Sequence, residues 1–540
     1  MPSSASSTAK ATRPLQAVLI LGALYFLARF TGLFQRLIIS ALLPIGANDA
    51  YNYAFKLPDF LNQMVAGGAI SLTFIPIFAQ FWNREQRDEA WRFFSTLTSV
   101  MSVVLVVLTA TMMLFTPQLL AWSFPGLLEP EKAETYRLAT QMTRIILPAQ
   151  LFFYLGGLLV GVLNTFKRFG ATGWTSALNN VVAIAVGVAL WSFMGPIGFA
   201  WGILLGAFCG NFLLPLLAAQ SAPRAEQPRF HFRFTLRDPD VRRFFLLALP
   251  IMLGVSLPVV DQLVVTRFAS LLPEGPVTYL ENANRLMIAA QGVLGQAAAV
   301  AAFPYLAAQV ANGDYPAFAE FLRSGLRRLL FVALPVSTLM IVWATPLTRL
   351  MFGYGLYNTP QNLRETAICL AFYCVGLFAW VAQGLVARGF YALGDTRTPT
   401  ILGTLLTFLF FVPLCALMGR FYGAAGLAFS TSIGAGAYFI SILLMLDKKM
   451  SQKPLNTPLG LEKIASTLLR TGLACFLMGI LGVLALKSGA MLFPDDKLGD
   501  VFNLLWSGAI AIATFIFAAT RFRIAEWSWL RSKIQRRKHA

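Results

Sequence analysis

The first apolar stretch of the chain, residues 15–44, reads LQAVLILGALYFLARFTGLFQRLIISALLP. A bilayer core needs about 20 apolar residues of helix, and this stretch is longer than that. Two cations, Arg29 and Arg36, interrupt it. A charge at mid-helix costs about 2.5–3.5 kcal/mol on the insertion scale, so the stretch predicts a membrane helix whose cations have a function.

The rest of the chain has the same character. Of its 540 residues, 57% are hydrophobic and 12% are charged, against about 45–50% and about 25% in soluble domains. This composition excludes a soluble globular protein, a disordered chain, a coiled coil and a secreted disulfide scaffold. The apolar runs are too long for barrel strands and do not alternate. The sequence therefore predicts an all-α polytopic membrane protein.

Fourteen candidate spans follow from the apolar runs, and the second and eighth are only weakly apolar. They lie near 15–44, 51–80, 93–122, 137–163, 170–192, 196–219, 243–269, 277–310, 324–346, 364–391, 398–419, 422–446, 464–486 and 502–520. The longest connection is near 220–242, and no connection is long enough for a catalytic domain. These lengths favour a transporter over an enzyme.

The formal net charge is +19, with 43 Lys and Arg against 24 Asp and Glu. In a membrane protein this excess is typical of cytoplasmic loops rather than of a nucleic-acid partner. We expect both termini in the cytoplasm, because the predicted outside loops hold few cations, namely Lys132, Arg137, Arg364, Arg420, Lys487 and Lys497.

The two halves of the chain resemble each other at an offset of about 228 residues. Lys56-Leu57 matches Arg285-Leu286, and Pro76 matches Pro304. Chance similarity between apolar helices is the alternative. The repeat predicts two six-helix lobes around a central cavity, plus two C-terminal helices. The predicted parts are an N-terminal lobe, a basic cytoplasmic linker, a C-terminal lobe, and a final pair of helices with a basic tail, at 1–219, 220–242, 243–446 and 447–540.

Cations concentrate in the opening helices of both repeats. Arg29 and Arg36 are seven residues apart, hence nearly on one helix face, and Lys56 and Arg285 occupy matching places in the second and eighth spans. A cavity lined with such cations suits an anion, especially a phosphate or diphosphate, whose oxygens match the guanidinium fork. An exporter of cationic drugs would need acids there instead.

Other intramembrane charges allow two interpretations each. Asp49 either caps a helix start or has a function. Asp261 either pairs with a lumen arginine or binds a coupling cation or proton. Arg267, like Arg144 and Arg388, either extends to the interface or serves the transport path. Five cysteines in apolar stretches and two histidines form no metal motif.

Several motifs together carry a family resemblance. They are Arg29-Phe30-Thr31-Gly32, Asp49-Ala50, Phe55-Lys56-Leu57-Pro58, Phe74-Ile75-Pro76, Arg285-Leu286-Met287, Gly292-Val293-Leu294-Gly295, Phe352-Gly353-Tyr354-Gly355 and, most specifically, the stretch from Phe390 to Pro399. With them the chain resembles the MurJ/MviN lipid II flippases over essentially its whole length.

The resemblance implies the multidrug/oligosaccharidyl-lipid/polysaccharide exporter fold. It also implies transport of the undecaprenyl-diphosphate-linked peptidoglycan precursor, lipid II, to the outer leaflet in cell wall biogenesis. Under this interpretation no cofactor or metal is needed, and the last two helices hold the prenyl tail. The predicted substrate-binding residues are Arg29, Arg36, Lys56, Asn62 and Arg285. The predicted gating or coupling residues are Asp49, Asp261 and Arg267.

Four positions depart from the family pattern. Gln35 precedes Arg36 where the family has Arg-Asp, and neutral residues replace family charges at Asn62, Gly67 and Asn284. These departures put individual head-group contacts in doubt more than the flippase prediction.

The expected mechanism is alternating access in the bacterial inner membrane, driven by the membrane potential or a sodium or proton gradient. Wall-synthesis proteins are expected partners. The alternatives are an exporter of the same fold for another lipid-linked oligosaccharide or a drug, and a membrane glycosyltransferase that uses the same lipid.

Overall fold

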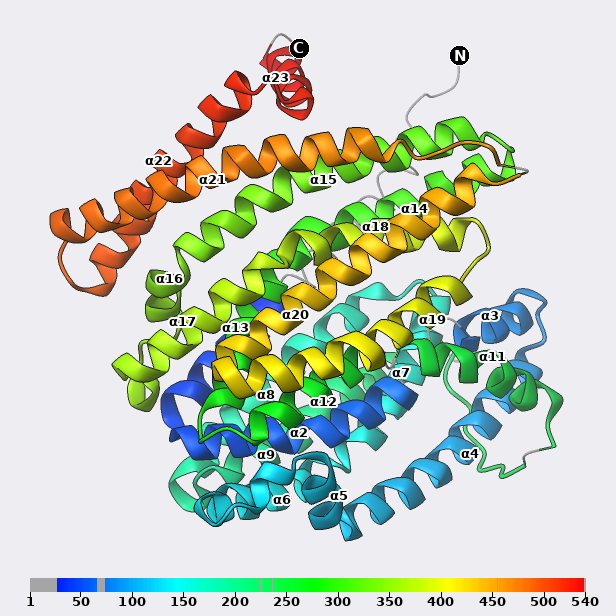
Figure 1. Cartoon of the computed structure of the whole chain (residues 1–540). Coiled ribbons are helices and arrows are strands. Elements are labelled where there is room, and N and C mark those ends of the chain that lie inside the picture. Colours follow the sequence, from blue (N-terminus) through cyan, green and yellow to red (C-terminus); the bar gives the residue numbers. More distant parts are fainter. Residues whose placement is uncertain are drawn as a thin grey trace, which may run out of the picture. The chain divides into compact units, whose positions relative to one another are not determined.

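The computed structural model of the chain describes residues 27–65, 73–223, 226–235, 237–255, 257–453 and 455–538. These residues form helices joined by short turns, and no strand occurs among them. Nine helices in this part of the chain are long and apolar enough to cross a membrane. The predicted all-α polytopic membrane fold is therefore confirmed (Figure 1).

Some predicted spans lie end to end in one helical stretch. Residues Arg397–Ser451 form a stretch of 55 residues that covers the predicted spans 398–419 and 422–446. One residue after the start of the second of these spans, Gly423 has φ 59° and ψ −139°, so two helices meet at a kink. The weakly apolar spans predicted at 51–80 and 277–310 are not among the nine helices. The total of fourteen stays a prediction, because the first span begins outside the described residues.

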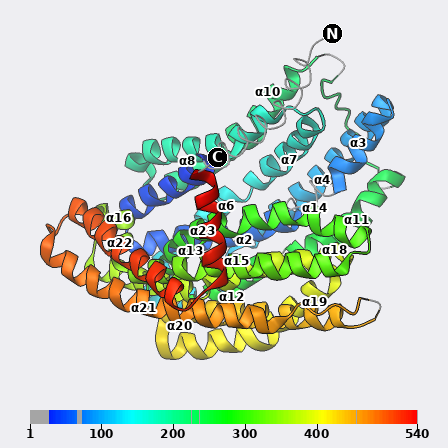
Figure 2. The ribbon, with the colours of Figure 1, turned by 90° about the horizontal axis from the view of Figure 1, so that it is seen from above.

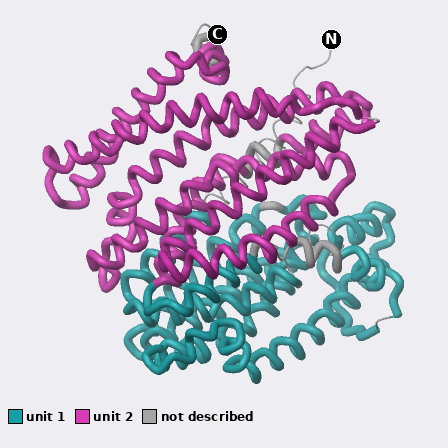
Figure 3. The backbone as a smooth tube through the Cα atoms, viewed as in Figure 1, with its two compact units in different colours: residues 1–275 teal, residues 276–540 magenta. Residues whose placement is uncertain are grey.

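Packing divides the chain into two compact units, residues 1–275 and 276–540 (Figure 3). In the first unit, residues 27–42 are helical. The elements that follow are α2 (Ile45–Val65), α3 (Ile75–Asn83), α4 (Arg87–Leu114), α5 (Thr116–Ser123), η2 (Pro125–Leu128), η3 (Pro130–Lys132), α6 (Ala133–Ile146), α7 (Ala149–Thr165), α8 (Phe169–Met194), α9 (Ile197–Gly206), η4 (Ala207–Leu213), α10 (Leu214–Gln220), α11 (Pro239–Val255) and α12 (Leu257–Ser270).

The second unit begins at the eighth predicted span. Its elements are α13 (Pro276–Gln291), η5 (Gly292–Gln296), α14 (Ala297–Ala311), α15 (Tyr315–Val342), α16 (Ala344–Phe352), η6 (Gly355–Tyr357), α17 (Pro360–Val375), α18 (Leu377–Ala392), α19 (Arg397–Leu406), η7 (Thr407–Phe411), α20 (Val412–Ser451), α21 (Leu461–Leu492), α22 (Lys497–Arg521) and α23 (Ala525–Lys538).

The seventh predicted span, now α11 and α12, packs with the first unit. The predicted lobes instead divide at the linker 220–242. Phe244 of α11 shows why the packing differs, since its ring is fully buried in the core of the first unit. The lobe division stays a prediction, because packing in one conformation does not show which helices move together.

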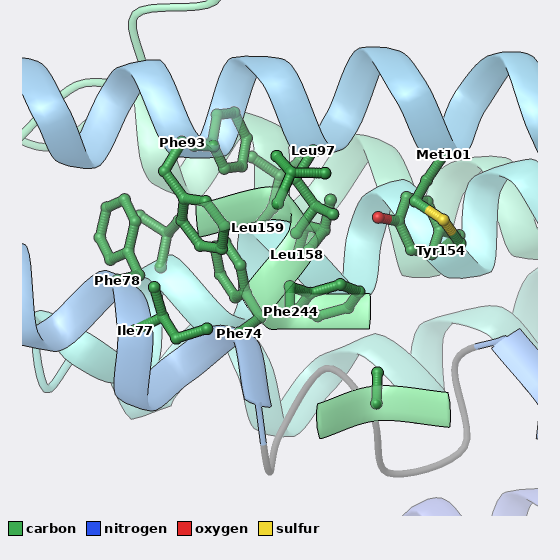
Figure 4. Packing of buried hydrophobic residues seen from close by; sticks show 14 of the residues in the cluster. Phe74, Ile77, Phe78, Phe93, Leu97, Met101, Tyr154, Leu158, Leu159 and Phe244 are labelled. Carbon is green, nitrogen blue, oxygen red and sulfur yellow. The ribbon is translucent and has the colours of Figure 1, made fainter. Parts of the chain in front are cut away.

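An aromatic cluster forms the core of the first unit (Figure 4). The Phe74 ring lies 5.5 Å from that of Phe78 and 5.8 Å from that of Phe93, centroid to centroid. Aromatic pairs at such distances add about 0.5–1.5 kcal/mol beyond the area that they bury. The cluster joins α3 to α4 and α7. It thereby holds α3, which is the last part of the second predicted span, whereas α2 is its first part.

The second unit has two cores. The larger one joins α14, α15, α18 and α20. A smaller one joins α15 to α21, α22 and α23 around Phe331 and Phe515, whose ring centroids are 5.4 Å apart. Figure 1 shows α21 running along α15. The last helices of the chain thus attach to the bundle through α15.

The stretch with the most specific family motif, residues 390–399, forms a helix cap. Gly394 has φ 75°, a left-handed conformation that glycine adopts without strain. Asp395 then accepts hydrogen bonds from the backbone N–H and the hydroxyl of Thr398, at 2.9 and 2.7 Å, and pairs with Lys449 of α20. Burial opposes ionisation, but the bonds from Lys449 and Thr398 outweigh it and hold the pKa of Asp395 at about 2.

Replacing Asp395 with Asn should keep the helix cap and remove the ion pair with Lys449. An unfolded aspartate has a pKa of about 3.9, so the carboxylate of the wild type contributes stability above that pH and loses it as the pH falls toward 2. We expect Asp395→Asn to lower the midpoint of thermal unfolding at pH 7, with the difference from wild type shrinking below pH 4.

Asp314→Asn is the matched control, because Asp314 caps α15 through the N–H of Ala317 without any ion pair among the described residues. It should change the unfolding midpoint little at either pH. An equal loss in both variants would show that the cap, and not the pair with Lys449, carries the stability.

Candidate functional site

The predicted cation Arg36 lies buried between the helix of residues 27–42 and α2. Its side chain is 3% exposed, and its Nη1 donates to Oδ1 of Asn52 at 3.0 Å. A guanidinium held away from water needs such an acceptor, because desolvation is costly. The sequence indicated Arg36 but gave no reason to single out Asn52, which is the residue that orients it.

One face of α2 collects buried polar side chains. Asp49, Asn52 and Lys56 follow each other at intervals of three and four residues, so they share one face of the helix. They are 3%, 5% and 8% exposed. Because Arg36 contacts Asn52 in the middle of this row, the structure brings together three of the predicted site residues, Arg36, Asp49 and Lys56.

The other predicted residues near these two helices are less buried. Arg29 is exposed in this conformation, and Asn62 and Gln35 are half-buried. Gly67 lies outside the described residues. The link between Arg29 and the predicted site is therefore only that Arg29 lies on nearly the same helix face as Arg36.

A second group of contacts holds the connecting segment, residues 267–275 at the end of the first unit, against the other helices of that unit. Arg267 donates from Nη1 to the carbonyl oxygens of Trp122 and Ser123, at 2.5 and 3.1 Å. These carbonyls end α5, where a cation also meets the negative end of the helix dipole. Arg267 thus bonds protein carbonyls, and both of its predicted interpretations, extension to the interface and a role in the transport path, stay predictions.

Lys132 is the centre of this group, and sequence reasoning missed it. Its side chain, 4% exposed, donates to the carbonyl oxygens of Ser270 and Leu272, at 2.8 and 2.6 Å, and to Glu129 at 2.8 Å. In the sequence it stands among outside-loop cations with no distinguishing pattern. Three acceptors around one buried ammonium make a strong and directional fastening.

The end of the connecting segment is held by carboxylates. Oδ2 of Asp49 accepts from the backbone N–H of Gly275 at 2.6 Å, and Oε1 of Glu274 accepts from the Thr135 hydroxyl at 2.6 Å. Gly46 leaves room for Glu274, since a Cβ at Gly46 would lie 2.7 Å from that carboxylate. Asp49 therefore bonds a distant segment, which favours the functional interpretation over the helix cap.

Asp261 lies half-buried in α12. It is on the same element as Arg267, six residues earlier. The structure leaves both of its predicted roles, pairing or coupling, as predictions.

In the second unit, Arg285 pairs with Glu281 of the same helix. Nε of Arg285 lies 3.1 Å from Oε1 of Glu281, and the two side chains are 47% and 17% exposed. The family acid next to this arginine is replaced by Asn284, and Glu281 one turn earlier supplies a carboxylate in this chain. Exposed pairs of this kind are worth at most about 1 kcal/mol, so Arg285 can exchange its partner for another anion.

A cavity of about 260 Å³ lies beside η5 and α18. Its polar lining is Gln291, Trp380, Arg388 and Tyr391. The π-helical turn η5 at Gly292–Gln296 forms part of its wall, and such turns occur often at functional sites. Arg388 therefore faces a cavity within the second unit.

Among the residues that the structure describes, no three His, Cys, Asp or Glu side chains gather as a metal site. None of the five cysteines, all of which the structure describes, is in a disulfide, and four of them are buried.

The sequence model of the family "Lipid II flippase MurJ" matches residues 44–493. The chain belongs to this family. The lipid II flippase MurJ of Burkholderia cenocepacia is 31% identical over 446 residues, which are 80% of this chain and 83% of that one. The probable lipid II flippase MurJ of Vibrio cholerae is 26% identical over 445 residues, 80% of this chain and 82% of that one.

Solved structures agree on the MurJ fold. A lipid II flippase MurJ in an inward closed conformation matches with TM-score 0.74 and 22% identity, over 93% of this chain and 98% of that one. An inward-facing multidrug transporter of the MATE family matches with TM-score 0.68 and 15% identity, over 78% and 94%. The predicted exporter fold is therefore confirmed, and as a MurJ family member the chain is a transporter and not an enzyme.

Replacing Lys132 with Met should loosen the connecting segment. The change removes three bonds to a charged donor, each worth about 1.5–3 kcal/mol, and leaves two buried carbonyls without their donor. We expect amide hydrogen exchange in residues 270–275 to accelerate at least tenfold, as measured by mass spectrometry on the full-length protein.

The control is Lys487→Met, which removes an exposed cation from another predicted outside loop. It should leave exchange in residues 270–275 unchanged. Unchanged exchange in the Lys132 variant as well would mean that the remaining contacts hold the segment without Lys132.

Proposed function

We propose that this protein is a lipid II flippase, which moves the undecaprenyl-diphosphate-linked disaccharide–peptide from the inner to the outer leaflet by alternating access. Membership of the MurJ family supports the substrate and the reaction. The structural observation that carries the proposal is Arg36, a cation 3% exposed within the first predicted span and beside α2. A purely structural helix pair would not retain so costly a charge.

The head group is the part of the substrate that these cations suit. Arg36 presents a planar guanidinium oriented by Asn52, and Lys56 adds a compact ammonium on the same side of α2. Arginine matches the oxygens of a phosphate with two parallel bonds, and lysine acts as a point charge. We assign Arg36, Lys56 and Arg285 to the diphosphate, with Arg29 and Asn62 as further contacts of the head group.

Gating is assigned to the connecting segment 267–275. In the present conformation Lys132, Asp49 and Glu274 hold it against α2, η3 and α6. Release of the substrate at this end requires these bonds to break and an alternative arrangement to replace them. In this proposal Asp49 and Arg267 act as gating residues, which is one of the two roles, gating or coupling, that the sequence predicts for them.

The driving force is the membrane potential, with a sodium or proton gradient as the means of resetting the transporter. An inside-negative potential favours outward movement of an anion by about 2.3 kcal/mol per charge per 100 mV. Asp261, an acid within α12, is the candidate for binding the coupling ion. No cofactor is required by this scheme.

The proposed location is the bacterial inner membrane, with both termini in the cytoplasm and wall-synthesis proteins as partners. The multi-pass helices support the membrane location, and the distribution of loop cations supports the orientation. The rival exporters of drugs or of other lipid-linked oligosaccharides share the fold, but family membership favours lipid II over them.

Depletion of the protein in its host tests the substrate. Lipid II should accumulate in the inner leaflet and disappear from the outer leaflet, as measured by labelling each leaflet separately. A normal distribution, in a host with no second flippase, would contradict the proposal and direct attention to other lipid diphosphates.

Arg36→Gln and Arg285→Gln should each slow flipping of lipid II at least tenfold. A charge-assisted hydrogen bond is worth about 1.5–3 kcal/mol, and glutamine keeps polarity without charge. The measurement is the rate at which lipid II in proteoliposomes becomes accessible from the opposite side.

Arg137→Gln is the matched control, because Arg137 is an exposed cation paired only with neighbouring Glu134 among the described residues. Its flipping rate should equal that of the wild type. Full activity in both test variants, at normal protein levels, would rule out their role in holding the diphosphate.

A further inference from the structure

The helix of residues 27–42 lies beside α8 (Figure 2), and a side chain of α8 bonds its backbone. Nδ2 of Asn180 donates to the carbonyl oxygen of Ala28 and to Oγ1 of Thr31, both at 3.1 Å. The Thr31 hydroxyl donates to the same carbonyl oxygen at 3.0 Å. Asn180 therefore binds the turn of the first helix that carries Arg29.

Two residues of the motif Arg29-Phe30-Thr31-Gly32 make this contact possible. Thr31 supplies the hydroxyl that accepts from the Asn180 amide. Gly32 supplies the space, because a Cβ at this position would lie 3.3 Å from Nδ2 of Asn180. The motif thus contains both a cation and the surface against which Asn180 packs.

The backbone that carries Asn180 is itself held firmly. Nδ2 of Asn179 donates to Oδ1 of Asn180 at 3.3 Å, which leaves the Nδ2 of Asn180 for the first helix. Two glycines bring α9 and η4 against the backbone of Asn179. A Cβ at Gly206 would lie 2.6 Å from its carbonyl oxygen, and a Cβ at Gly210 would lie 2.4 Å from its nitrogen. Asn180 therefore reaches the first helix from a closely packed part of α8.

The contact with Asn180 lies opposite the exposed side of the first helix. Successive residues of an α-helix are about 100° apart around its axis, so Ala28, Thr31 and Gly32 lie within one sector of about 100°. Phe30 and Phe34 are 59% and 50% exposed, and the same spacing places them in the opposite sector. The contact with α8 therefore fixes which side of the first helix faces the other helices of the unit.

The cations lie between these two sectors. Arg29 and Arg36 share nearly one face, about a quarter turn from the centre of the contact. A helix that loses the contact is free to turn about its axis, and the cation face turns with it. Asn52 of α2 bonds the guanidinium of Arg36, whereas Asn180 of α8 bonds the backbone of the turn that carries Arg29. The two contacts, about 10 Å apart along the helix, fix the rotation at both ends of the cation face.

We propose that Asn180 is a positioning residue for Arg29. It holds the first helix at the rotation in which Arg29 and Arg36 face the head group of the substrate together. Thr31 and Gly32 are the residues of the first helix that receive it, and Asn180 itself acts on the substrate only through Arg29. The inference rests on the proposed function, because that function assigns Arg29 to the head group.

The test compares rates of lipid II flipping by the full-length protein in proteoliposomes. Asn180→Leu and Thr31→Val should each slow flipping about tenfold, because a misplacement of about 1 Å can cost up to about a hundredfold in rate. Arg29→Gln should slow it at least as much. The double variant Arg29→Gln/Asn180→Leu should be no slower than Arg29→Gln alone, because residues that act as a unit are not additive.

Three control variants separate positioning from general loss of packing. Thr31→Ser keeps the hydroxyl and should flip at the wild-type rate. Thr111→Val makes the same change as Thr31→Val in α4, where the lost bond is only that to the Val107 carbonyl of the same helix. Tyr438→Phe removes a hydroxyl bond from α20 to the Pro399 carbonyl of α19. Both should leave the flipping rate unchanged.

Amide hydrogen exchange of residues 27–34 tests the contact without any transport assay. Asn180→Leu should accelerate exchange there about fivefold, the factor that corresponds to the net worth of one hydrogen bond. Arg29→Gln should leave exchange in this turn unchanged, because it removes neither partner of Asn180.

Different results would overturn different parts of this scheme. A double variant about tenfold slower than Arg29→Gln would mean that Asn180 acts independently of Arg29. Wild-type flipping and exchange in Asn180→Leu, with slow flipping in Arg29→Gln, would refute the positioning role and leave the proposed function intact. Wild-type flipping in Arg29→Gln, or no flipping of lipid II by the wild type, would contradict the proposed function and this inference with it.

Discussion

A charged side chain or backbone amide that is buried, whether in a bilayer or inside the protein, has no water to bond, so it must find its partner within the protein. That constraint explains both the helical chain and the placement of its buried charges. Arg36 bonds the Asn52 amide, Lys132 bonds two carbonyls and a carboxylate, and Asp49 accepts from the Gly275 amide. Apart from the bond between Lys132 and nearby Glu129, these contacts join residues 16 or more positions apart in the chain, so satisfying a charge also fixes the tertiary arrangement.

The contacts that satisfy charges also make a structure that can change. A buried apolar contact is lost gradually as two surfaces separate, whereas the bonds of Lys132 are directional and break together. The connecting segment 267–275 is attached through several such bonds, beside the packing of its buried residues Ala269 and Ser270. The aromatic core around Phe74 and Phe93, by contrast, is dense and apolar. The first unit thus combines a densely packed apolar core with a terminal segment, residues 267–275, that is held by a small number of polar contacts.

Several sequence predictions succeeded because they rest on local chemistry. The all-α membrane fold follows from long apolar runs, and the predicted break at 420–421 lies two residues before the kink at Gly423. Arg36 was recognised because a cation in an apolar run is costly wherever it lies. The prediction could not name Asn52, Lys132 or Glu274. Their partners lie 16, 138 and 139 residues away, and no local pattern marks them.

Composition, apolar periodicity and motif content by themselves determined that this chain is a helical membrane transporter of the MurJ family with cations in its first helices. These properties depend on the residue types and on their neighbours in the chain. Tertiary structure alone decided that α11 and α12 pack with the first unit, that Lys132 bonds the carbonyls of Ser270 and Leu272, and that Glu526 of α23 pairs with Arg327 of α15. The physical reason is that burial and hydrogen bonding depend on which surfaces meet, and distant surfaces meet only when the helices have packed.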